Sequence, residues 1–189
     1  MSEAFREKAR ELIKAGEGCI QHMYLDTVGK VTVGVGNMLP NAAAATQLPF
    51  IHADDLTEAS DEEIRTEFDL VSTQTAGLLA SKYKSFTKLM LSEPAIDDLL
   101  DERIDGFESQ LKIDFPNYES CPEPARLGML DMAFNLGNAG LVNKFPSFTR
   151  AARQENWSEC ELQCNRRGIA ESRNNEVKGL FQACVAPAD

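Results

Sequence analysis

The sequence predicts an α+β fold in which one helix precedes a small antiparallel sheet and the rest of the chain is helical. Three observations support this. Residues 3–15 repeat apolar side chains at helical spacing, residues 22–36 are rich in β-branched and aromatic residues, and helical patterns return from residue 60 onward. With 189 residues, of which 43% are hydrophobic, the chain suits one compact domain.

The first predicted element is a helix over residues 3–15. Its apolar positions are Phe5, Ala9, Leu12 and Ile13. Ser2 is placed to cap its first turn, and Gly16 and Gly18 are expected to end it. Charged residues between the apolar positions indicate that one face is solvated.

Two short strands are expected next, over His22–Asp26 and Lys30–Gly36, with Thr27–Gly29 as the hairpin turn between them. Gly29 supplies a residue that tolerates positive φ at this turn. Residues 37–59 contain alanine, proline and asparagine without a clean period, so they are expected to be mostly irregular.

The remaining elements are predicted to be helices. Ser60 and Glu63 form a capping box that opens a helix through about residue 80. A second helix begins after Ser92. Pro122 and Pro124 introduce an apolar helix over residues 125–136 that is expected to be buried. The later predicted helices cover residues 147–154, 157–166 and 175–184.

The net charge of −11 is concentrated in the middle of the chain. Residues 54–123 carry eighteen acidic and six basic side chains, whereas the segments on either side are close to neutral. Nucleic-acid binding needs a basic patch, so we expect no nucleic-acid partner. The same charge disfavours simple attraction to an anionic membrane or cell wall.

No apolar run approaches the roughly 20 residues needed to cross a bilayer, so we expect no membrane partner. The first residues, Met-Ser-Glu-Ala-Phe-Arg-Glu-Lys, lack the apolar core of a signal peptide. We therefore expect synthesis in the cytoplasm without ordinary signal-directed export.

Cysteine and histidine usage predicts no zinc site. The cysteines are Cys19, Cys121, Cys160, Cys164 and Cys184. No Cys-x-x-Cys pair occurs, and two histidines are too few for an obvious zinc site. A bridge between Cys160 and Cys164 is open in an oxidising compartment, but buried free thiols are favoured.

Two carboxylates are candidates for acid–base chemistry. Glu17 is expected near the negative end of a helix, and partial burial there would favour its protonated form. Asp26 lies beside a solvated turn, where it is expected to stay ionised. Such a pair can break an acetal bond. The chain has thirty acidic residues, however, so this pairing alone is weak evidence.

The spacing around these carboxylates is more specific. The stretch reads Glu17-Gly18, then Tyr24-Leu-Asp26-Thr27-Val-Gly29-Lys-Val-Thr32-Val-Gly34-Val-Gly36. It closely resembles the signature of the phage lysozymes, the muramidase endolysins of glycoside hydrolase family 24. That signature is glutamate-glycine, then Tyr-x-Asp-Thr-x-Gly-x-x-Thr-(Ile/Val)-Gly-x-Gly, with the same intervals from glutamate to aspartate to threonine.

The resemblance extends to other parts of the chain. Residues 130–137, with Phe134 and Asn135, resemble the central buried helix of the family, and Phe145, Trp157 and Arg173 follow in the family's order. Residues 38–91 hardly match. The resemblance implies a single lysozyme-like domain over residues 1–189 with a cleft between two lobes. The implied bounds are an α/β lobe at about 15–95, with an extra helical insertion at about 61–91, and a helical lobe at about 96–185 joined by helix 3–15.

The resemblance also implies catalytic roles. Glu17 matches the general acid that protonates the leaving oxygen, Asp26 the acid that holds or activates water, and Thr32 the hydroxyl that helps place that water. Attack by water from the far face implies inversion. Met38 and Phe134 match positions that touch sugar, and Arg173 matches an arginine that pairs with the catalytic glutamate.

Each matched residue also has a structural interpretation. Glu17 could be a surface acid at a helix end, and Asp26 could cap the hairpin, alone or in addition to its chemistry. Thr32 could be an ordinary strand residue, Phe134 is favoured as core, and Arg173 could be a solvated helix charge. In addition, Asn37 stands where many relatives have histidine, so a histidine–carboxylate pair of the family cannot form in its usual way.

The function that the resemblance implies is hydrolysis of the β-1,4 bond between N-acetylmuramic acid and N-acetylglucosamine in peptidoglycan, with no metal or organic cofactor. The rivals are a lytic transglycosylase, a chitinase-like glycosidase and an inactive wall-binding module. We expect a monomer acting on periplasmic glycan strands after release by a holin or delivery by a secretion system. An immunity protein or a component of the delivery system would be its partner in the second case.

Overall fold

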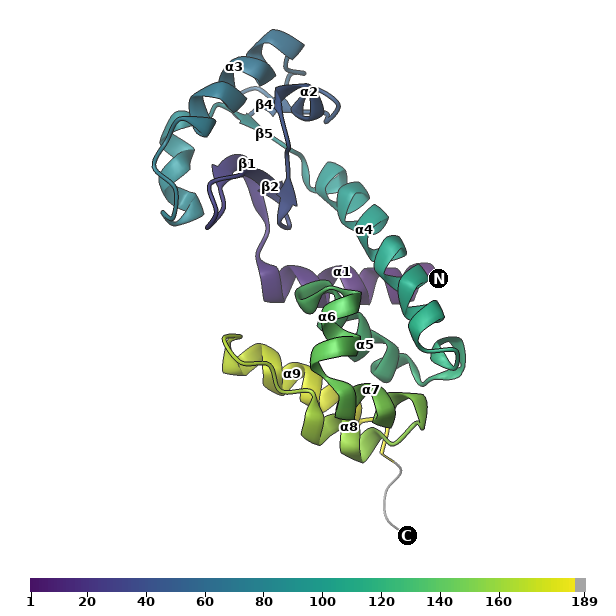
Figure 1. The fold of residues 1–189 in the computed structure, drawn as a ribbon. Coiled ribbons are helices and arrows are strands. Elements are labelled where there is room, and N and C mark those ends of the chain that lie inside the picture. Colours follow the sequence, from purple (N-terminus) through teal and green to yellow (C-terminus); the bar gives the residue numbers. More distant parts are fainter. Residues whose placement is uncertain (186–189) are drawn as a thin grey trace. The chain divides into compact units, whose positions relative to one another are not determined.

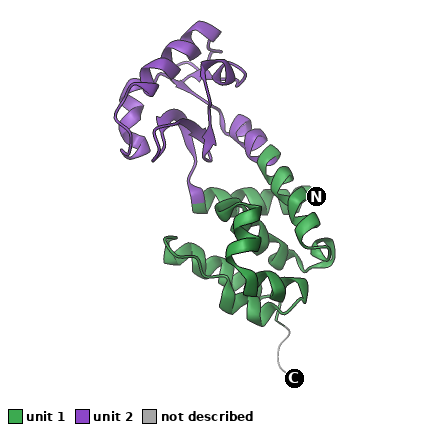
Figure 2. Cartoon of the chain, in the orientation of Figure 1, with its two compact units in different colours: residues 1–16, 102–189 green, residues 17–101 purple. Residues whose placement is uncertain are grey.

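The computed structural model describes residues 1–185 and confirms the α+β class, with mainly helices, a three-stranded antiparallel sheet and a two-stranded one (Figure 1). The chain forms two compact units (Figure 2). Unit 1 comprises residues 1–16 and those from 102 onward, and unit 2 comprises residues 17–101.

Helix α1, Glu3–Glu17, begins as predicted but ends later. The Ser2 hydroxyl accepts a hydrogen bond from the Phe5 amide at 3.3 Å, which confirms the expected cap. Gly16 remains helical, and Gly18, with φ of +80°, follows the last helical residue. The predicted end at residue 15 is therefore wrong by two residues. The buried residues of α1 are Phe5, Ala9, Leu12 and Ile13.

The predicted hairpin is present in unit 2 as β1, Ile20–Leu25, and β2, Val31–Gly34. The strands pair antiparallel with Tyr24 opposite Thr32, and an irregularity interrupts the register between Ile20 and Tyr24. A third strand, β3, Asn37–Met38, pairs with β2. Strand β3 was not predicted, because its two residues are too few to show a period in a segment that was expected to be mostly irregular.

The rest of unit 2 consists of short elements and one longer helix. They are α2 (Ala42–Ala45), β4 (Ile51–His52), α3 (Asp61–Ser72), the 3₁₀ helix η1 (Ala80–Phe86) and β5 (Leu89–Met90). Strands β4 and β5 pair antiparallel. The Leu91 amide donates to the Gln21 carbonyl at 2.9 Å, so the chain after β5 is joined to β1.

Helix α3 shows how a local signal fixes a helix start. Ser60 and Glu63 form the predicted capping box, with each side chain bonded to the backbone of the other residue. The predicted end near residue 80 is wrong, because α3 ends at Ser72 and the chain turns through Gly77, with φ of +78°.

Helix α4, Glu93–Asp114, runs from unit 2 into unit 1 (Figure 2). The other helices of unit 1 are η2 (Tyr118–Ser120), α5 (Glu123–Leu136), α6 (Asn138–Lys144), α7 (Pro146–Arg153), α8 (Trp157–Gln163) and α9 (Glu171–Gln182). Helix α6 was not predicted, and α9 begins four residues before the predicted start.

The core of unit 1 forms around α5, which is buried as predicted. A Cβ on Gly128 of α5 would lie 2.8 Å from Phe181 of α9, so glycine permits this close packing. The Phe181 ring contacts the rings of Phe148 and Trp157, with centroid distances of 5.3 and 6.5 Å. Trp157 is therefore part of the core.

All five cysteines are free thiols, which for Cys160 and Cys164 confirms the favoured interpretation. Cys121, Cys160 and Cys164 are buried. Burial raises the pKa of the Cys121 thiol to about 11 and that of the Cys160 thiol to about 12, so both stay protonated at neutral pH.

Candidate active site

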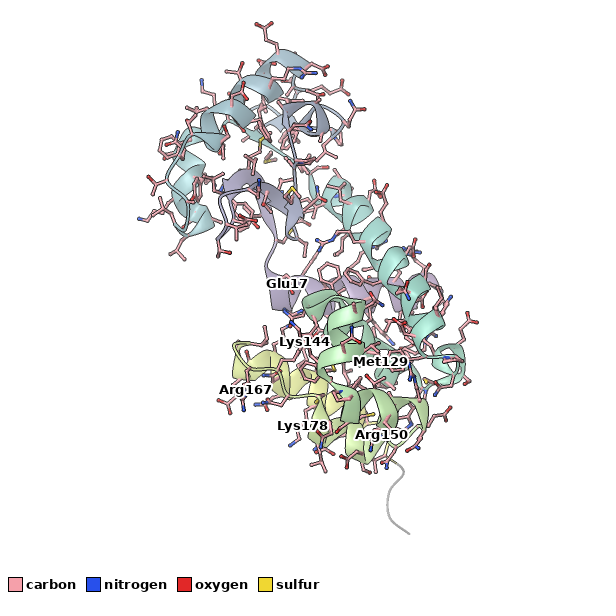
Figure 3. The ribbon with its side chains drawn as sticks, viewed as in Figure 1. Glu17, Met129, Lys144, Arg150, Arg167 and Lys178 are labelled. Carbon is pink, nitrogen blue, oxygen red and sulfur yellow. The ribbon has the colours of Figure 1, made fainter. Side chains whose placement is uncertain are left out.

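Glu17 is the last residue of α1, and Figure 3 labels it at the point where the helix ends. Its carboxylate therefore stands at the negative end of the helix dipole, as predicted. The predicted partial burial is wrong, because Glu17 and the two residues that follow it are exposed.

Asp26 is held by the turn between β1 and β2. Its Oδ1 accepts hydrogen bonds from the amides of Val28, at 2.9 Å, and Lys30, at 2.8 Å. The Asp26 amide donates to the Lys30 carbonyl, and Gly29 has φ of +79°. Asp26 thus caps the hairpin, which was one of its two interpretations. Its Oδ2 makes no hydrogen bond within residues 1–185, so one oxygen remains open to a ligand.

Thr32 is almost fully buried, with 2% exposure. Its hydroxyl donates to the Lys30 carbonyl at 3.1 Å, so the hydroxyl oxygen has lone pairs left to accept a hydrogen bond. A role in placing water would therefore use Thr32 as an acceptor. The backbone of Lys30 connects this residue to Asp26, because it bonds to both side chains.

The strand register places several predicted residues on one face of the sheet. Thr32 is opposite Tyr24 in β1 and opposite Met38 in β3, so these three side chains share a face. Asp26 follows Tyr24 by two residues and shares that face. Diagonal neighbours of this kind are typically about 7–8 Å apart, so we expect Asp26 and Thr32 to lie near each other on this face.

The same face is bounded at one end by a helix. Gly34 follows Thr32 by two residues, and a Cβ built on it would lie 3.4 Å from Ile96 of α4. At this position the backbone is therefore covered by Ile96 within unit 2. Met38 is 49% exposed, so its side chain is accessible for the predicted sugar contact.

Phe134 lies in the core of unit 1, which matches the favoured interpretation. Its exposure is 7%, its ring centroid lies 5.1 Å from that of Phe107, and the Arg103 guanidinium lies 4.3 Å from the ring centre. With neighbours on its ring from α4, Phe134 offers little surface to a sugar.

Arg173 is buried, with 6% exposure, so its interpretation as a solvated helix charge is wrong. Its Nη2 and Nε donate to Oδ1 of Asp131 at 2.7 and 3.1 Å. Arg166 donates from Nη1 to Oδ2 of the same aspartate at 2.8 Å. We call these three residues the Asp131 cluster. One buried carboxylate thus accepts hydrogen bonds from two buried guanidinium groups.

The Asp131 cluster reaches the end of α1. A Cβ on Gly16 would lie 2.4 Å from Nε of Arg173, so the guanidinium packs directly against the helix backbone one residue before Glu17. The predicted pairing of Arg173 with Glu17 stays a prediction.

Sequence reasoning missed Asp131 and Arg166. The signal for Asp131 was an acidic residue inside an otherwise apolar helix, since a buried carboxylate requires a partner. Nothing in the sequence pattern identified Arg166 as that partner. In the structure, the Asn174 side chain fixes the Arg166 backbone, because it accepts from the Arg166 amide at 3.1 Å and donates to the Arg166 carbonyl at 2.9 Å.

Within residues 1–185, no cluster of three or more His, Cys, Asp or Glu side chains is arranged to bind a metal ion. Over the same range, no helix combines the length and the apolar character that crossing a membrane requires.

No protein-family model matches the chain, and no curated protein matches it either. The resemblance to family 24 muramidases therefore rests on the sequence alone, chiefly on the spacing of Glu17, Asp26 and Thr32 and less on residues 130–137.

Proposed function

We propose that this protein is a muramidase with a lysozyme-like fold. It hydrolyses the β-1,4 bond between N-acetylmuramic acid and N-acetylglucosamine in peptidoglycan, without a metal or organic cofactor. The observation that carries this proposal is that Asp26 and Thr32 share one face of a hairpin. In the chain, this hairpin comes directly after the helix that ends at Glu17.

In the proposed reaction, the Glu17 carboxyl donates a proton to the glycosidic oxygen as the bond between that oxygen and the sugar C1 breaks. A water molecule attacks C1 from the opposite face, and the Asp26 carboxylate accepts a proton from it. The configuration at C1 is inverted. This mechanism needs a carboxyl separation of about 6.5–9.5 Å, wide enough for the water.

The hydrogen bonds of the hairpin support these roles. Oδ1 of Asp26 is fixed by two backbone amides, which orients the carboxylate and leaves Oδ2 for the water. Thr32 has its own proton engaged by the Lys30 carbonyl, so it would accept a hydrogen bond from the same water. Exposed Met38, opposite Thr32, would contact the sugar.

The charge bears on delivery. Unit 2 contains fourteen acidic residues and five lysine or arginine residues, which disfavours attraction to an anionic wall. We therefore propose delivery to the periplasm of a rival cell by a contractile secretion system rather than lysis by free diffusion. A gene located in a phage lysis cassette beside a holin would contradict this route.

The test is digestion of purified peptidoglycan, followed by mass spectrometry of the products. Wild type should release fragments with reducing ends. Glu17→Gln should lower the rate by about 10²–10⁴-fold, the usual contribution of a positioned acid. Asp26→Asn should lower it strongly while keeping the hairpin, because asparagine retains the Oδ1 acceptor.

Two matched controls separate chemistry from folding. Glu11→Gln removes another exposed carboxylate of α1, and Asp55→Asn changes another aspartate whose Oδ1 accepts from a nearby amide, that of Thr57 at 3.0 Å. Both should keep wild-type activity. Products with 1,6-anhydro ends would indicate a transglycosylase, and cleavage of chitin oligomers alone would indicate a chitinase-like enzyme. Equal activity of wild type and Glu17→Gln would reject the catalytic role.

A further inference from the structure

Unit 2 contains a cavity of about 420 Å³ on the side of α3 that faces β5. Its lining residues are His52, Glu62, Glu63, Thr66, Glu67, Leu70, Phe86, Lys88 and Leu89. The volume lies within the range of pockets that hold a small ligand or a few side chains of a partner. These residues belong to the segment that hardly matches the family signature, so a role for the cavity does not depend on muramidase activity.

The apolar part of this cavity is open to solvent. Leu70 is 46% exposed and Phe86 is 38% exposed. Both side chains line the cavity, so they give it an apolar wall that solvent can reach.

The polar part of the cavity is mainly acidic. Glu67 is engaged by the amides of Lys88 and Leu89, and Glu63 by Ser60 in the capping box, so both have structural roles. The Glu62 carboxylate makes no hydrogen bond or ion pair with any described residue. It is therefore available to a partner that carries a positive charge.

Charge decides between the candidate occupants. The lining carries three carboxylates and a single lysine, Lys88. His52, which lies 3.4 Å from Glu63, adds a positive charge only when it is protonated. Unit 2 as a whole carries a formal charge of −9, from fourteen acidic and five basic residues. A second copy of this face would therefore be repelled, and an acidic ligand would be disfavoured.

We propose that this cavity docks a segment of another protein in which a lysine or arginine stands beside a large apolar side chain. The apolar group would cover Leu70 and Phe86, and the cationic group would pair with Glu62. Glu62 and Leu70 lie eight positions apart in α3, so one short peptide segment can contact both.

The probe for this proposal is a phage-displayed library of random peptides about 12 residues long, selected on the full-length protein. Enriched peptides should carry lysine or arginine within two positions of Leu, Ile, Met or Phe. Their dissociation constants are then measured by fluorescence anisotropy. Glu62→Lys should weaken binding by about 10-fold or more. Leu70→Ser should weaken it by about 5-fold, because part of the apolar contact is lost.

Two substitutions in unit 2, at exposed residues outside the cavity lining, serve as controls. Asp69→Lys places the same charge change on α3 outside the cavity, and Leu79→Ser removes a leucine that is 75% exposed and does not line it. Both should leave binding within about 2-fold, and circular dichroism should give all four variants the wild-type helix content. Failure to enrich any peptide, enrichment of acidic peptides, or equal binding by Glu62→Lys and Asp69→Lys would overturn the proposal.

Discussion

Asp131 in unit 1 and Asp26 in unit 2 show two ways of holding an aspartate. Asp131 is fully buried, and both of its oxygens accept hydrogen bonds from guanidinium groups. Asp26 is half-buried, and one of its oxygens accepts from two backbone amides. The two units also differ in net charge. Unit 1 is close to neutral, with sixteen acidic and fourteen basic residues, whereas unit 2 has a charge of −9.

This difference separates a structural carboxylate from one available for chemistry. Both oxygens of Asp131 accept hydrogen bonds from buried guanidinium groups, one from Arg166 and one from Arg173. Asp131 therefore joins α5 to α9, which contains Arg173, and to the segment between α8 and α9, which contains Arg166. The backbone amides that hold Asp26 orient it but leave Oδ2 open to a ligand. A carboxylate held through one oxygen is both positioned and accessible, which is what a catalytic group requires.

The largest expected effect separates these two aspartates by the same substitution. Asp131→Asn should lower the free energy of unfolding by about 3–5 kcal/mol, because it removes the buried negative charge to which both guanidinium groups donate. Asp26→Asn should lower it by about 1 kcal/mol or less, since the amide oxygen still caps the hairpin. Urea unfolding at pH 7 measures both values. Equal losses would show that burial does not distinguish the two sites.

The hairpin that holds Asp26 was predictable because its interactions are local. The acceptors and donors around Asp26 lie within four residues of it, and the capping box of α3 spans three. Residue types alone therefore indicate these features. The exposure of Glu17 was not predictable, because it depends on which segments pack near the end of α1.

The Asp131 cluster was not predictable because its partners are distant in sequence. Arg166 and Arg173 lie 35 and 42 residues after Asp131. The sequence contains nineteen basic residues, and no local pattern selects these two. The end of α3 was missed for a different reason: no strong helix-breaking residue occurs until Gly77, although the structure leaves the helix after Ser72.

A second substitution tests how rigidly the Asp131 cluster is held. Gly16→Ala would place a Cβ 2.4 Å from Nε of Arg173, and Arg173 cannot move away without losing its bonds to Asp131. We expect a loss of about 1–3 kcal/mol in the free energy of unfolding, despite the higher helix propensity of alanine.

Gly106→Ala is the matched control for Gly16→Ala. Gly106 lies inside α4 in unit 1, and no atom lies within 4 Å of a Cβ built there. Alanine should therefore stabilise the protein by up to about 1 kcal/mol. Thermal unfolding of the two variants side by side gives the comparison. A stabilising Gly16→Ala substitution would show that Arg173 is free to rearrange.

A smaller effect is expected at Glu67, the buried carboxylate of unit 2. Burial raises its pKa, although the amides of Lys88 and Leu89 oppose the shift. The folded state therefore binds this proton more tightly than the unfolded state. As pH rises from the ordinary glutamate pKa through the raised one, Glu67 ionises and the protein loses stability.

Glu67→Gln removes this titration. Relative to wild type, the variant should become more stable as pH rises from 4 to 7, and urea unfolding across that range measures the difference. Other titrating groups are common to both proteins, so their contributions largely cancel. A difference that does not change with pH, or that changes in the opposite direction, would contradict the inferred shift.

The smallest effect is expected from an ion pair with almost the same contact distance as the Asp131 cluster. Nζ of Lys8 lies 2.6 Å from Oε1 of Glu123, compared with 2.7 Å between Arg173 and Asp131. The side chains of the first pair are 56% and 44% exposed, and those of the second are 6% and 0% exposed. Lys8→Ala should therefore cost about 1 kcal/mol or less.

Salt sharpens this last comparison. Raising NaCl from about 0.05 to 0.5 M should reduce the effect of Lys8→Ala, since mobile ions screen exposed charges, and should change the effect of Asp131→Asn little. Urea unfolding at both salt concentrations measures these effects. A salt-independent loss of several kcal/mol for Lys8→Ala would mean that contact distance, rather than burial, determines the energy of these pairs. The distinction between Asp131 and Asp26 would then lose its physical basis, because it assigns their different roles to burial.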